Sequence, residues 1–337
     1  MHFHSSGVWA VGSMGESQQA RAKDVPGFPV PGAKIGVAQS GGGSRGSWQV
    51  GVWRYCAEQK LFPEGISFTS GSSVGSINSL ALAMFTPGPD QVDKAIGVME
   101  ESWGRLGNTK SVWRMRFPPY LAGLWSNSIG LTPNLKILLE DVVDVDAIRT
   151  SGVELRILAC DLLTGELHTF DQTGPIISSV LASSSFPITF PLERIEATDT
   201  HPGGLYTDAG VRDIAPAKSA IDAGCDRVMI LLSRDPSQVE MMEESDLKNV
   251  LQRTERELDL MLTEIIKGDI AMAQLINRMV RTGKTALLGP PFDSYCDVPI
   301  DILYPRTQLG SSLSFERSMM VAQMDQGYED AKAYFGG

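Results

Sequence analysis

"KIGVAQSGGGSRGSWQVG" (residues 34–51) joins a short apolar run to a glycine-rich stretch and then to the start of a helical pattern. The apolar run ends in glycines, which predicts a buried strand over residues 34–40. Apolar side chains then recur at helical spacing over residues 47–61, which predicts a helix. The same order repeats, with a strand expected over 66–70 and a small-residue, apolar helix over 74–85. Strand, turn and helix in alternation predict an α/β fold with a mostly parallel sheet.

Later segments continue this pattern. Alternating residues and a turn at Thr164-Gly165 predict a strand and a hairpin return over 154–170. A helix is expected over 175–187, where Pro187 stops it. The remaining expected elements are a buried strand over 226–234, an edge strand over 299–305 and a closing helix over 314–335.

Two segments differ from their surroundings. Residues 86–135 are rich in Pro, Gly, Trp and Arg, and we interpret them as a cap of loops and helices over the sheet edge. Residues 243–282 are the most helical segment, with leucines on one stripe and charges opposite. We expect a second helix to begin there near Asp269. This helical segment could be a dimer surface, a lid or plain core.

Composition limits the class of protein. The chain has 337 residues, is 42% hydrophobic and carries a net charge of −11. Nucleic-acid binding needs clustered Lys and Arg, so we expect no nucleic-acid partner. Bulk charge also argues against membrane attachment, although a local apolar membrane-facing surface stays open. The sequence contains no 18-residue apolar run and no signal peptide, so we expect a cytoplasmic protein or one peripheral to a membrane. The sequence does not decide the oligomeric state.

The chain is interpreted as one domain. Residues 1–30 read as a leader outside the fold, and residues 31–337 as a single domain. The cysteines are far apart without CxxC spacing, which favours four buried thiols and no metal site. They are Cys56, Cys160, Cys225 and Cys296.

The glycine stretch has three possible uses: a dinucleotide-binding turn, a phosphate cradle or an oxyanion hole. Gly41, Gly43 and Gly46 satisfy G-x-G-x-x-G, but a dinucleotide site needs an acidic residue at the end of the second strand. That strand ends in Thr69-Ser70-Gly71 instead. A second phosphate candidate, "RTGKT" at 281–285, lacks the upstream glycine of a P-loop.

"GSSVG" (residues 71–75) follows the second strand and precedes a helix. This is G-x-S-x-G in the strand–turn–helix context that its mechanism needs. Gly71 and Gly75 flank a turn too tight for Cβ atoms, and Ser73 is therefore exposed at the carboxyl edge of the sheet. A nucleophilic serine for acyl transfer also needs backbone N–H donors for its oxyanion, and the glycine stretch can supply them.

The base that activates this serine is the next question. Outside the leader the only histidines are His168 and His201, so a triad that ends in a late histidine is impossible. Either His201 serves from an unusual position, or the base is a carboxylate. Asp208, in "YTDAG", lies between an aromatic strand and a small-residue turn and is the better candidate. Asp213, before Ile-Ala-Pro, reads more like a turn residue.

The three motifs, in this order, resemble the patatin-like phospholipase family. That family shows G-G-G-x-R/K-G, G-x-S-x-G and D-G-G/A, which stand here as "GGGSRG" (41–46), "GSSVG" (71–75) and "DAG" (208–210). "ASSSFPITFPLERI" (182–195) resembles a further signature of the family. The resemblance implies a three-layer α/β/α patatin-like fold, lipid acyl hydrolysis and a Ser–Asp dyad without histidine. No cofactor or metal is implied.

The resemblance also implies a role for each motif residue. Ser73 is the nucleophile and Asp208 the base, while the amides of Gly42, Gly43 and Ser44 form the oxyanion hole. The supporting motif residues are Gly41, Arg45, Gly46, Gly71, Gly75 and Gly210. Ala209 stands where the family usually has glycine, and an alanine fits there if its φ is negative.

The expected function is therefore a serine lipid acyl hydrolase, of phospholipase A, lysophospholipase or esterase type. The expected partner is a lipid or ester substrate, and transient contact with a membrane interface is kept as a further alternative. The alternatives are an acyltransferase on the same dyad and a weakened patatin-fold scaffold. Aromatic residues of segment 86–135 could line an acyl channel, touch a membrane or pack the cap itself. They are Trp103, Trp113, Phe117, Tyr120 and Trp125.

Overall fold

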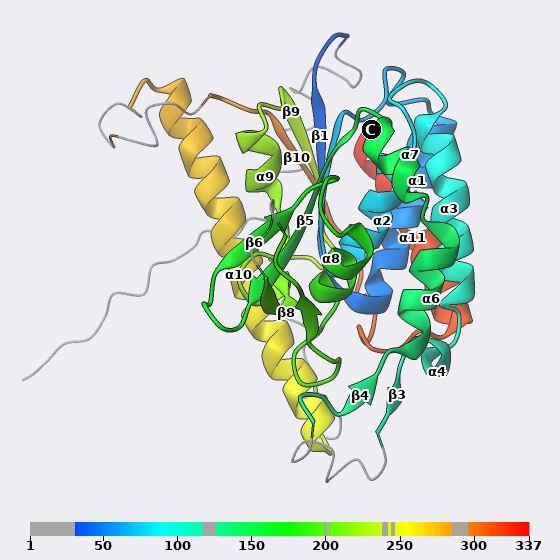
Figure 1. Cartoon of the computed structure of the whole chain (residues 1–337). Helices are drawn as coiled ribbons and strands as arrows, with labels where there is room; N and C mark the ends of the chain where they lie inside the picture. The colour runs from blue at the N-terminus through cyan, green and yellow to red at the C-terminus, as the bar shows by residue number, and fades with distance from the viewer. Residues whose placement is uncertain are drawn as a thin grey trace, which may run out of the picture.

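The two strand–turn–helix units lie side by side in the middle of one sheet (Figure 1). The computed structural model describes residues 31–116, 126–198, 201, 203–237, 242–243, 247–284, 289 and 296–336. The main sheet has the order β10-β9-β1-β2-β5-β8-β7, with β6 also paired to β5. Its strands are β1 Ile35–Gln39, β2 Phe68–Ser72, β5 Glu154–Asp161, β6 Leu167–Phe170, β7 Glu193–Ile195, β8 Gly204–Asp208, β9 Arg227–Leu231 and β10 Ile300–Leu303.

The strands from β10 to β5 pair in parallel, whereas β6, β7 and β8 run antiparallel to their neighbours. The predicted hairpin return is confirmed, because β6 pairs antiparallel with β5. The predicted edge strand is confirmed as β10, at one end of the strand order. A separate ribbon is formed by β3 Arg114–Met115 and β4 Gly130–Leu131.

Helices cover both faces of the sheet, as the predicted three-layer α/β/α fold requires. One layer is built from α1 Ser47–Glu58, α2 Val74–Ala83, α3 Gln91–Arg105, α6 Pro133–Val142, α8 Ile176–Ser183 and α11 Arg317–Phe335. The opposite layer contains α9 Ala217–Asp222 and α10 Val250–Arg281. Shorter elements are η1 Gly43–Gly46, α4 Thr109–Val112, α7 Val145–Thr150 and η2 Ala209–Val211.

The core is divided by the sheet because successive side chains of a strand point to opposite faces. Val37 of β1 packs in the cluster with α1, α2 and α11, whereas its neighbour Ala38 packs with α9 and α10. Met229 and Ile230 of β9 divide in the same way. These strands are buried on both faces, which explains their continuous apolar sequence.

The structure differs from the expectations drawn from the sequence at three points. The segment 243–282 contains one continuous helix through Asp269, α10, and not two. The expected cap over 86–135 is in part a layer helix, because α3 packs on α1 and α2 and buries Trp103 to 1% exposure. Phe117, Tyr120 and Trp125 lie outside the described residues. Cys296 is exposed, so only three of the four thiols are buried.

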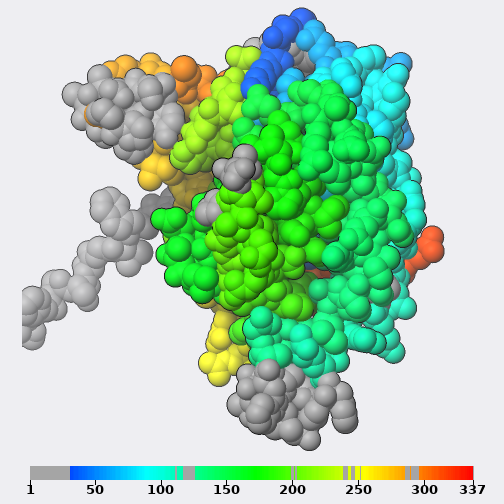
Figure 2. Space-filling model, in the orientation of Figure 1, coloured from blue at the N-terminus to red at the C-terminus, as the bar shows by residue number. Residues whose placement is uncertain are grey.

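Figure 2 shows the face of the molecule on which α6 and the β5–β8 region lie, formed largely by the green middle of the chain. The yellow end of α10 emerges at the bottom of this view. None of the described helices is both long and apolar enough to cross a membrane.

Candidate active site

Strand register brings the three sequence motifs to one edge of the sheet. Strand β2 ends at Ser72, which is opposite Leu158 of β5. The next residue of β5, Ala159, is opposite Asp208, at the end of the antiparallel strand β8. Strand β1 ends beside β2 at the same level, with Gln39 opposite Gly71. Ser73, Asp208 and the glycine stretch therefore meet although the serine and the aspartate are 135 positions apart in the sequence.

Ser73 occupies the turn between β2 and α2 in a strained conformation, with φ 53° and ψ −130°. A non-glycine residue with positive φ is uncommon and persists only where its surroundings impose it. Here the two flanking glycines do so. A Cβ atom at Gly75 would clash with the Gln39 carbonyl, and one at Gly71 with the backbone of Gly75. The G-x-S-x-G spacing is thus explained by backbone contact.

Asp208 is 3% exposed, and its carboxyl lies beside the Ser73 side chain. Burial raises the pKa of its carboxyl from 3.8 to about 6, while hydrogen bonds from Ser73 and the Gly210 amide oppose the rise. The Gly210 N–H donates to Asp208 Oδ1 at 2.8 Å. A buried carboxylate with a raised pKa is a better proton acceptor than an exposed one, which suits a general base.

The glycine stretch presents two free amides beside Ser73. Within the described part of the chain, the N–H groups of Gly42 and Gly43 have no acceptor. Both residues and Ser73 line the same pocket. Side chains are excluded here, since a Cβ at Gly41 would lie 2.9 Å from Ser73 Cβ and one at Gly42 would clash with Ser233.

Ser44, the third expected oxyanion donor, is engaged elsewhere. Its N–H donates to the Ser312 carbonyl at 2.8 Å, and its hydroxyl donates to the Ser311 carbonyl at 3.0 Å. The amide geometry therefore leaves Gly42 and Gly43 as the available donors.

Arg45 and Gly46 hold the glycine stretch in place. Arg45 is 7% exposed, donates from Nε to the Gly310 carbonyl at 2.7 Å and pairs with Asp259 at 2.9 Å. The Gly46 carbonyl accepts from Asn78 Nδ2 at 3.1 Å. A Cβ at Gly46 would lie 2.8 Å from a Val74 methyl, so a larger residue would push the stretch off α2.

The remaining acid and histidine candidates lie away from the serine. Asp213 does not line the pocket, and its side chain accepts from the Ala215 amide at 3.2 Å, as a turn residue does. His201 packs its ring on Phe170, and neither His201 nor His168 lines the pocket. Among the described residues no cluster of side chains suits a metal ion.

Ala209 adopts a negative φ, since it is absent from the non-glycine residues with positive φ. Its side chain is fully buried at the start of η2. The methyl group is therefore accommodated next to Asp208 without backbone strain, as the sequence required.

Two serines of "ASSSFP" support the site, and sequence reasoning did not assign them this role. Ser183 Oγ accepts the Ser73 N–H at 2.8 Å. The Ser185 carbonyl accepts the Asp208 N–H at 3.1 Å and the Thr207 hydroxyl at 2.8 Å. One short segment thus holds the backbone at both Ser73 and Asp208. The run of three serines in an otherwise apolar segment was the feature of the sequence that could have indicated this role.

A large apolar pocket of about 1010 Å³, partly open to solvent, lies over these groups. We call it the apolar pocket. Its floor carries Gly42, Gly43, Ser73 and Asp208. The apolar lining is Val74, Ile77, Leu106, Val112, Leu135, Phe186, Pro187, Phe190, Val211, Ile214, Leu258, Met261, Leu262, Ile265, Leu313 and Phe315. Trp103 is not among them, whereas α4 and α10 both contribute.

A nucleophile-type serine, a buried carboxylate and free amides under an apolar pocket define a site suited to lipid esters. A family model, the patatin-like phospholipase, matches residues 37–221, more than half of the chain. The chain belongs to the patatin-like phospholipase family. Family membership identifies it as a lipid acyl hydrolase.

More distant likenesses exist among solved structures. VipD from Legionella pneumophila is 13% identical, with 91% of this chain and 67% of that chain covered and a TM-score of 0.42. ExoU of Pseudomonas aeruginosa, solved in complex with SpcU, is 14% identical, with 92% and 71% covered and a TM-score of 0.29. Similarities this remote say nothing about the activity of this chain. No curated protein matches the chain.

Proposed function

We propose that this protein hydrolyses lipid esters through an acyl-enzyme on Ser73, with Asp208 as the general base. One observation carries the proposal: the Ser73 side chain lies beside the carboxyl of a buried aspartate and shares a pocket with two backbone amides that have no acceptor among the described residues. A serine hydroxyl alone is a weak nucleophile, so it needs both an adjacent base and a charge-stabilising site.

In the first half of the reaction, Ser73 Oγ attacks the ester carbonyl carbon while its proton passes to Asp208. The carbonyl oxygen becomes an oxyanion, which the Gly42 and Gly43 amides stabilise. Such donors each contribute about 3 kcal/mol in related chemistry. Collapse of this intermediate breaks the ester bond. The departing alkoxide takes the proton from Asp208, leaving the acyl group on Ser73.

In the second half, a water molecule attacks the acyl-enzyme and gives its proton to Asp208. The same two amides receive the second oxyanion. Its collapse releases the fatty acid and returns the proton to Ser73 Oγ, so the dyad is restored. The apolar pocket supports a long acyl chain as the group transferred, because its lining is mostly aliphatic and aromatic.

A serine-directed fluorophosphonate probe tests the proposal. We expect the wild-type protein to be labelled and to hydrolyse p-nitrophenyl esters, and Ser73→Ala to lose both, by about 10⁴-fold or more in turnover. Ser72→Ala is the matched control. Ser72 is the preceding residue, its hydroxyl has no partner among the described residues, and it does not line the apolar pocket.

Undiminished labelling or turnover in Ser73→Ala would contradict the proposed nucleophile. A wild-type protein without turnover at any chain length would instead favour the scaffold alternative.

A further inference from the structure

Two buried amide side chains hold the two ends of the glycine stretch, residues 41–46. They are Gln49 of α1 and Asn78 of α2, and both are fully buried. Gln49 Nε2 donates to the carbonyl of Ser40, directly before the stretch, at 3.0 Å. Asn78 Nδ2 donates to the carbonyl of Gly46, the last residue of the stretch, at 3.1 Å. We call Gln49 and Asn78 the amide pair.

The two amides are also bonded to each other, so they act as one unit. Asn78 Nδ2 donates to Gln49 Oε1 at 2.8 Å. Gln49 Nε2 makes a second bond, to the Leu231 carbonyl at the end of β9, at 3.3 Å. Trp103 of α3 donates from Nε1 to Asn78 Oδ1 at 2.9 Å. Every N–H donor of the amide pair therefore has an acceptor, and a buried polar network that is fully satisfied is rigid.

The glycine stretch needs such support because its sequence, "GGGSRG", has few side chains to pack. Glycine also loses more conformational freedom on folding than any other residue. Gly43 has a φ of 57°, in the left-handed region that favours glycine. The shape of the stretch must therefore be set by bonds to its backbone.

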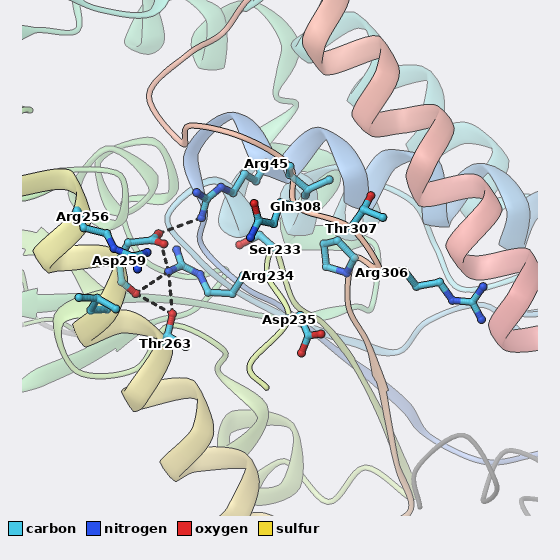
Figure 3. Close-up of a pocket in the computed structure, with 13 residues that line it drawn as sticks. Arg45, Ser233, Arg234, Asp235, Arg256, Asp259, Thr263, Arg306, Thr307 and Gln308 are labelled. Atoms are coloured by element: carbon cyan, nitrogen blue, oxygen red, sulfur yellow. Dashed lines mark hydrogen bonds and ion pairs between the residues drawn. The ribbon is translucent and has the colours of Figure 1, made fainter. Parts of the chain in front are cut away.

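Arg45 restrains the stretch from the side of α10. Figure 3 shows its guanidinium directed toward Asp259, with which it pairs at 2.9 Å. Gly42 and Gly43 come before Arg45 in the chain, and Gln49 restrains the backbone on their other side. Loss of the amide pair would leave the Arg45 contacts in place and loosen both ends of the stretch.

We propose that Gln49 and Asn78 are positioning residues that keep the Gly42 and Gly43 amides directed at the oxyanion. This inference rests on the proposed function. Neither member of the amide pair lines the apolar pocket, so both act on the ester only through the backbone of the glycine stretch. Oxyanion donors are effective because they are oriented before the charge develops. A displacement of about 1 Å caused by a distant change can cost about 100-fold in rate.

Turnover of a p-nitrophenyl ester by Gln49→Met tests the proposal. Methionine keeps the length of the side chain but has neither the N–H donors nor the oxygen acceptor. We expect kcat to fall about tenfold or more and KM to change by less than about twofold. The amides stabilise the oxyanion and not the bound ester, so the loss belongs to kcat.

Gln91→Met is the matched control. Gln91 of α3 is 2% exposed, and its Nε2 donates to the carbonyls of Ile66 and Leu82, each at 3.1 Å. It does not line the apolar pocket. The same substitution should therefore lower the free energy of unfolding in urea to a similar extent and leave kcat unchanged. Equal losses of kcat in the two variants, or full kcat in Gln49→Met, would overturn the proposal.

Hydrogen exchange of residues 40–47, followed by mass spectrometry, tests the restraint without turnover. The N–H groups of Gly41 and Ser44 have backbone acceptors and report on the stretch. We expect exchange in this segment to be about tenfold faster in Gln49→Met and unchanged in Gln91→Met. Unchanged exchange in Gln49→Met would also overturn the proposal. Faster exchange in a protein whose wild type hydrolyses no ester would refute the proposed function and leave the restraint standing.

Should Gln49→Met fail to fold, Trp103→Phe decides. It removes only the N–H that bonds to Asn78 and keeps an aromatic ring at this buried position. We expect kcat to fall about threefold at unchanged KM, the cost of one hydrogen bond. Full kcat in this variant would overturn the proposal.

Discussion

Two aspartates five positions apart, Asp208 and Asp213, are both held in surroundings that disfavour their charge. Burial raises the pKa of Asp208 to about 6. Burial, with Asp269 nearby, raises that of Asp213 to about 7. Of the two, only Asp208 lies beside Ser73. Asp208 and Asp213 can therefore be compared as two aspartates whose pKa values are raised to a similar extent, one next to the serine and one away from it.

We expect Asp208→Asn to abolish turnover and to stabilise the protein at pH 7. The pKa of the wild-type Asp208 carboxyl is higher in the folded state than in the unfolded state. The stability that Asp208 contributes is therefore present below about pH 4 and is lost as pH rises through about 6. The change from 3.8 to about 6 corresponds to about 3 kcal/mol, which the asparagine would recover. Urea unfolding at pH 7 measures this. Asp213→Asn should also stabilise the protein but keep its activity, and inactivity of both variants would argue against a distinct role for Asp208.

The pH dependence of kcat/KM should show an acid limb governed by Asp208. The base must be ionised to accept the Ser73 proton, so activity falls about tenfold for each pH unit below about 6. Rates on a neutral ester between about pH 4 and pH 8 measure the limb. It should persist in Asp213→Asn. A limb near pH 4 would indicate a carboxylate without the burial described above.

That Ser73 and Asp208 lie together could be predicted from the sequence, because each stands in a short motif with local backbone requirements. The roles of Ser183 and Ser185 could not, since they depend on which strand ends meet in the sheet. The pairing of Arg45 with Asp259 joins residues 214 positions apart and carries no local pattern. What escaped the sequence was long-range packing around the site.

At the scale of elements, Asp259 links α10 to the edge of the sheet at which Ser73 lies. This residue pairs with Arg45 of η1 and with Arg234, which follows β9. Leu262 and Ile266, on the same side of the helix, are buried against β9 and its neighbours. The helix therefore forms one wall of the apolar pocket, to which Leu258, Leu262 and Ile265 contribute.

Asp259→Asn should destabilise the protein strongly, by about 3 kcal/mol, because it leaves two buried guanidinium groups without a counter-charge. Denaturant unfolding measures the loss. Glu257→Gln, on the same helix but at an exposed pair with Arg253, should change stability by less than about 1 kcal/mol. An equal change in the free energy of unfolding in the two variants would mean that the buried pairs of Asp259 with Arg45 and Arg234 stabilise the protein no more than an exposed ion pair does.

The unbroken course of α10 shows why its sequence was misleading. "KGDI" at 267–270 looks like a helix end, since glycine is a poor helix former. The buried stripe nevertheless continues across it, from Ile266 to Ile270, and packing overrides propensity. A Cβ at Gly268 would meet nothing within 4 Å.

Gly268→Ala should therefore stabilise the protein by about 0.5–1 kcal/mol, by lowering the entropy of the unfolded chain. Gly327→Ala in α11 is the opposite case. Its Cβ would clash with the Trp48 carbonyl of α1, so the two helices must separate, at about 1–3 kcal/mol. Thermal unfolding of both variants compares them. Destabilisation by Gly268→Ala would mean that α10 is bent or broken in solution.

At the scale of the whole molecule, the part matched by the family model ends before the fold is complete. Residues 37–221 include only the last three residues of β1, 37–39, and exclude β9, which pairs with β1 along its full length. They also exclude α11, whose Asp330 accepts a hydrogen bond from Trp48 of α1 at 2.9 Å. The sheet centre and the α1 layer thus depend on the C-terminal third of the chain.

A fragment of residues 31–221 should fail to fold cooperatively, whereas residues 31–337 should unfold in one transition. Without β9 the strand β1 becomes an unpaired, apolar edge, and without α11 the buried face of α1 is exposed to water. Near-UV circular dichroism during heating measures both. A sharp, reversible transition in the shorter fragment would mean that residues 31–221 fold without β9, β10 and α11. The interpretation of residues 31–337 as a single domain would then be wrong.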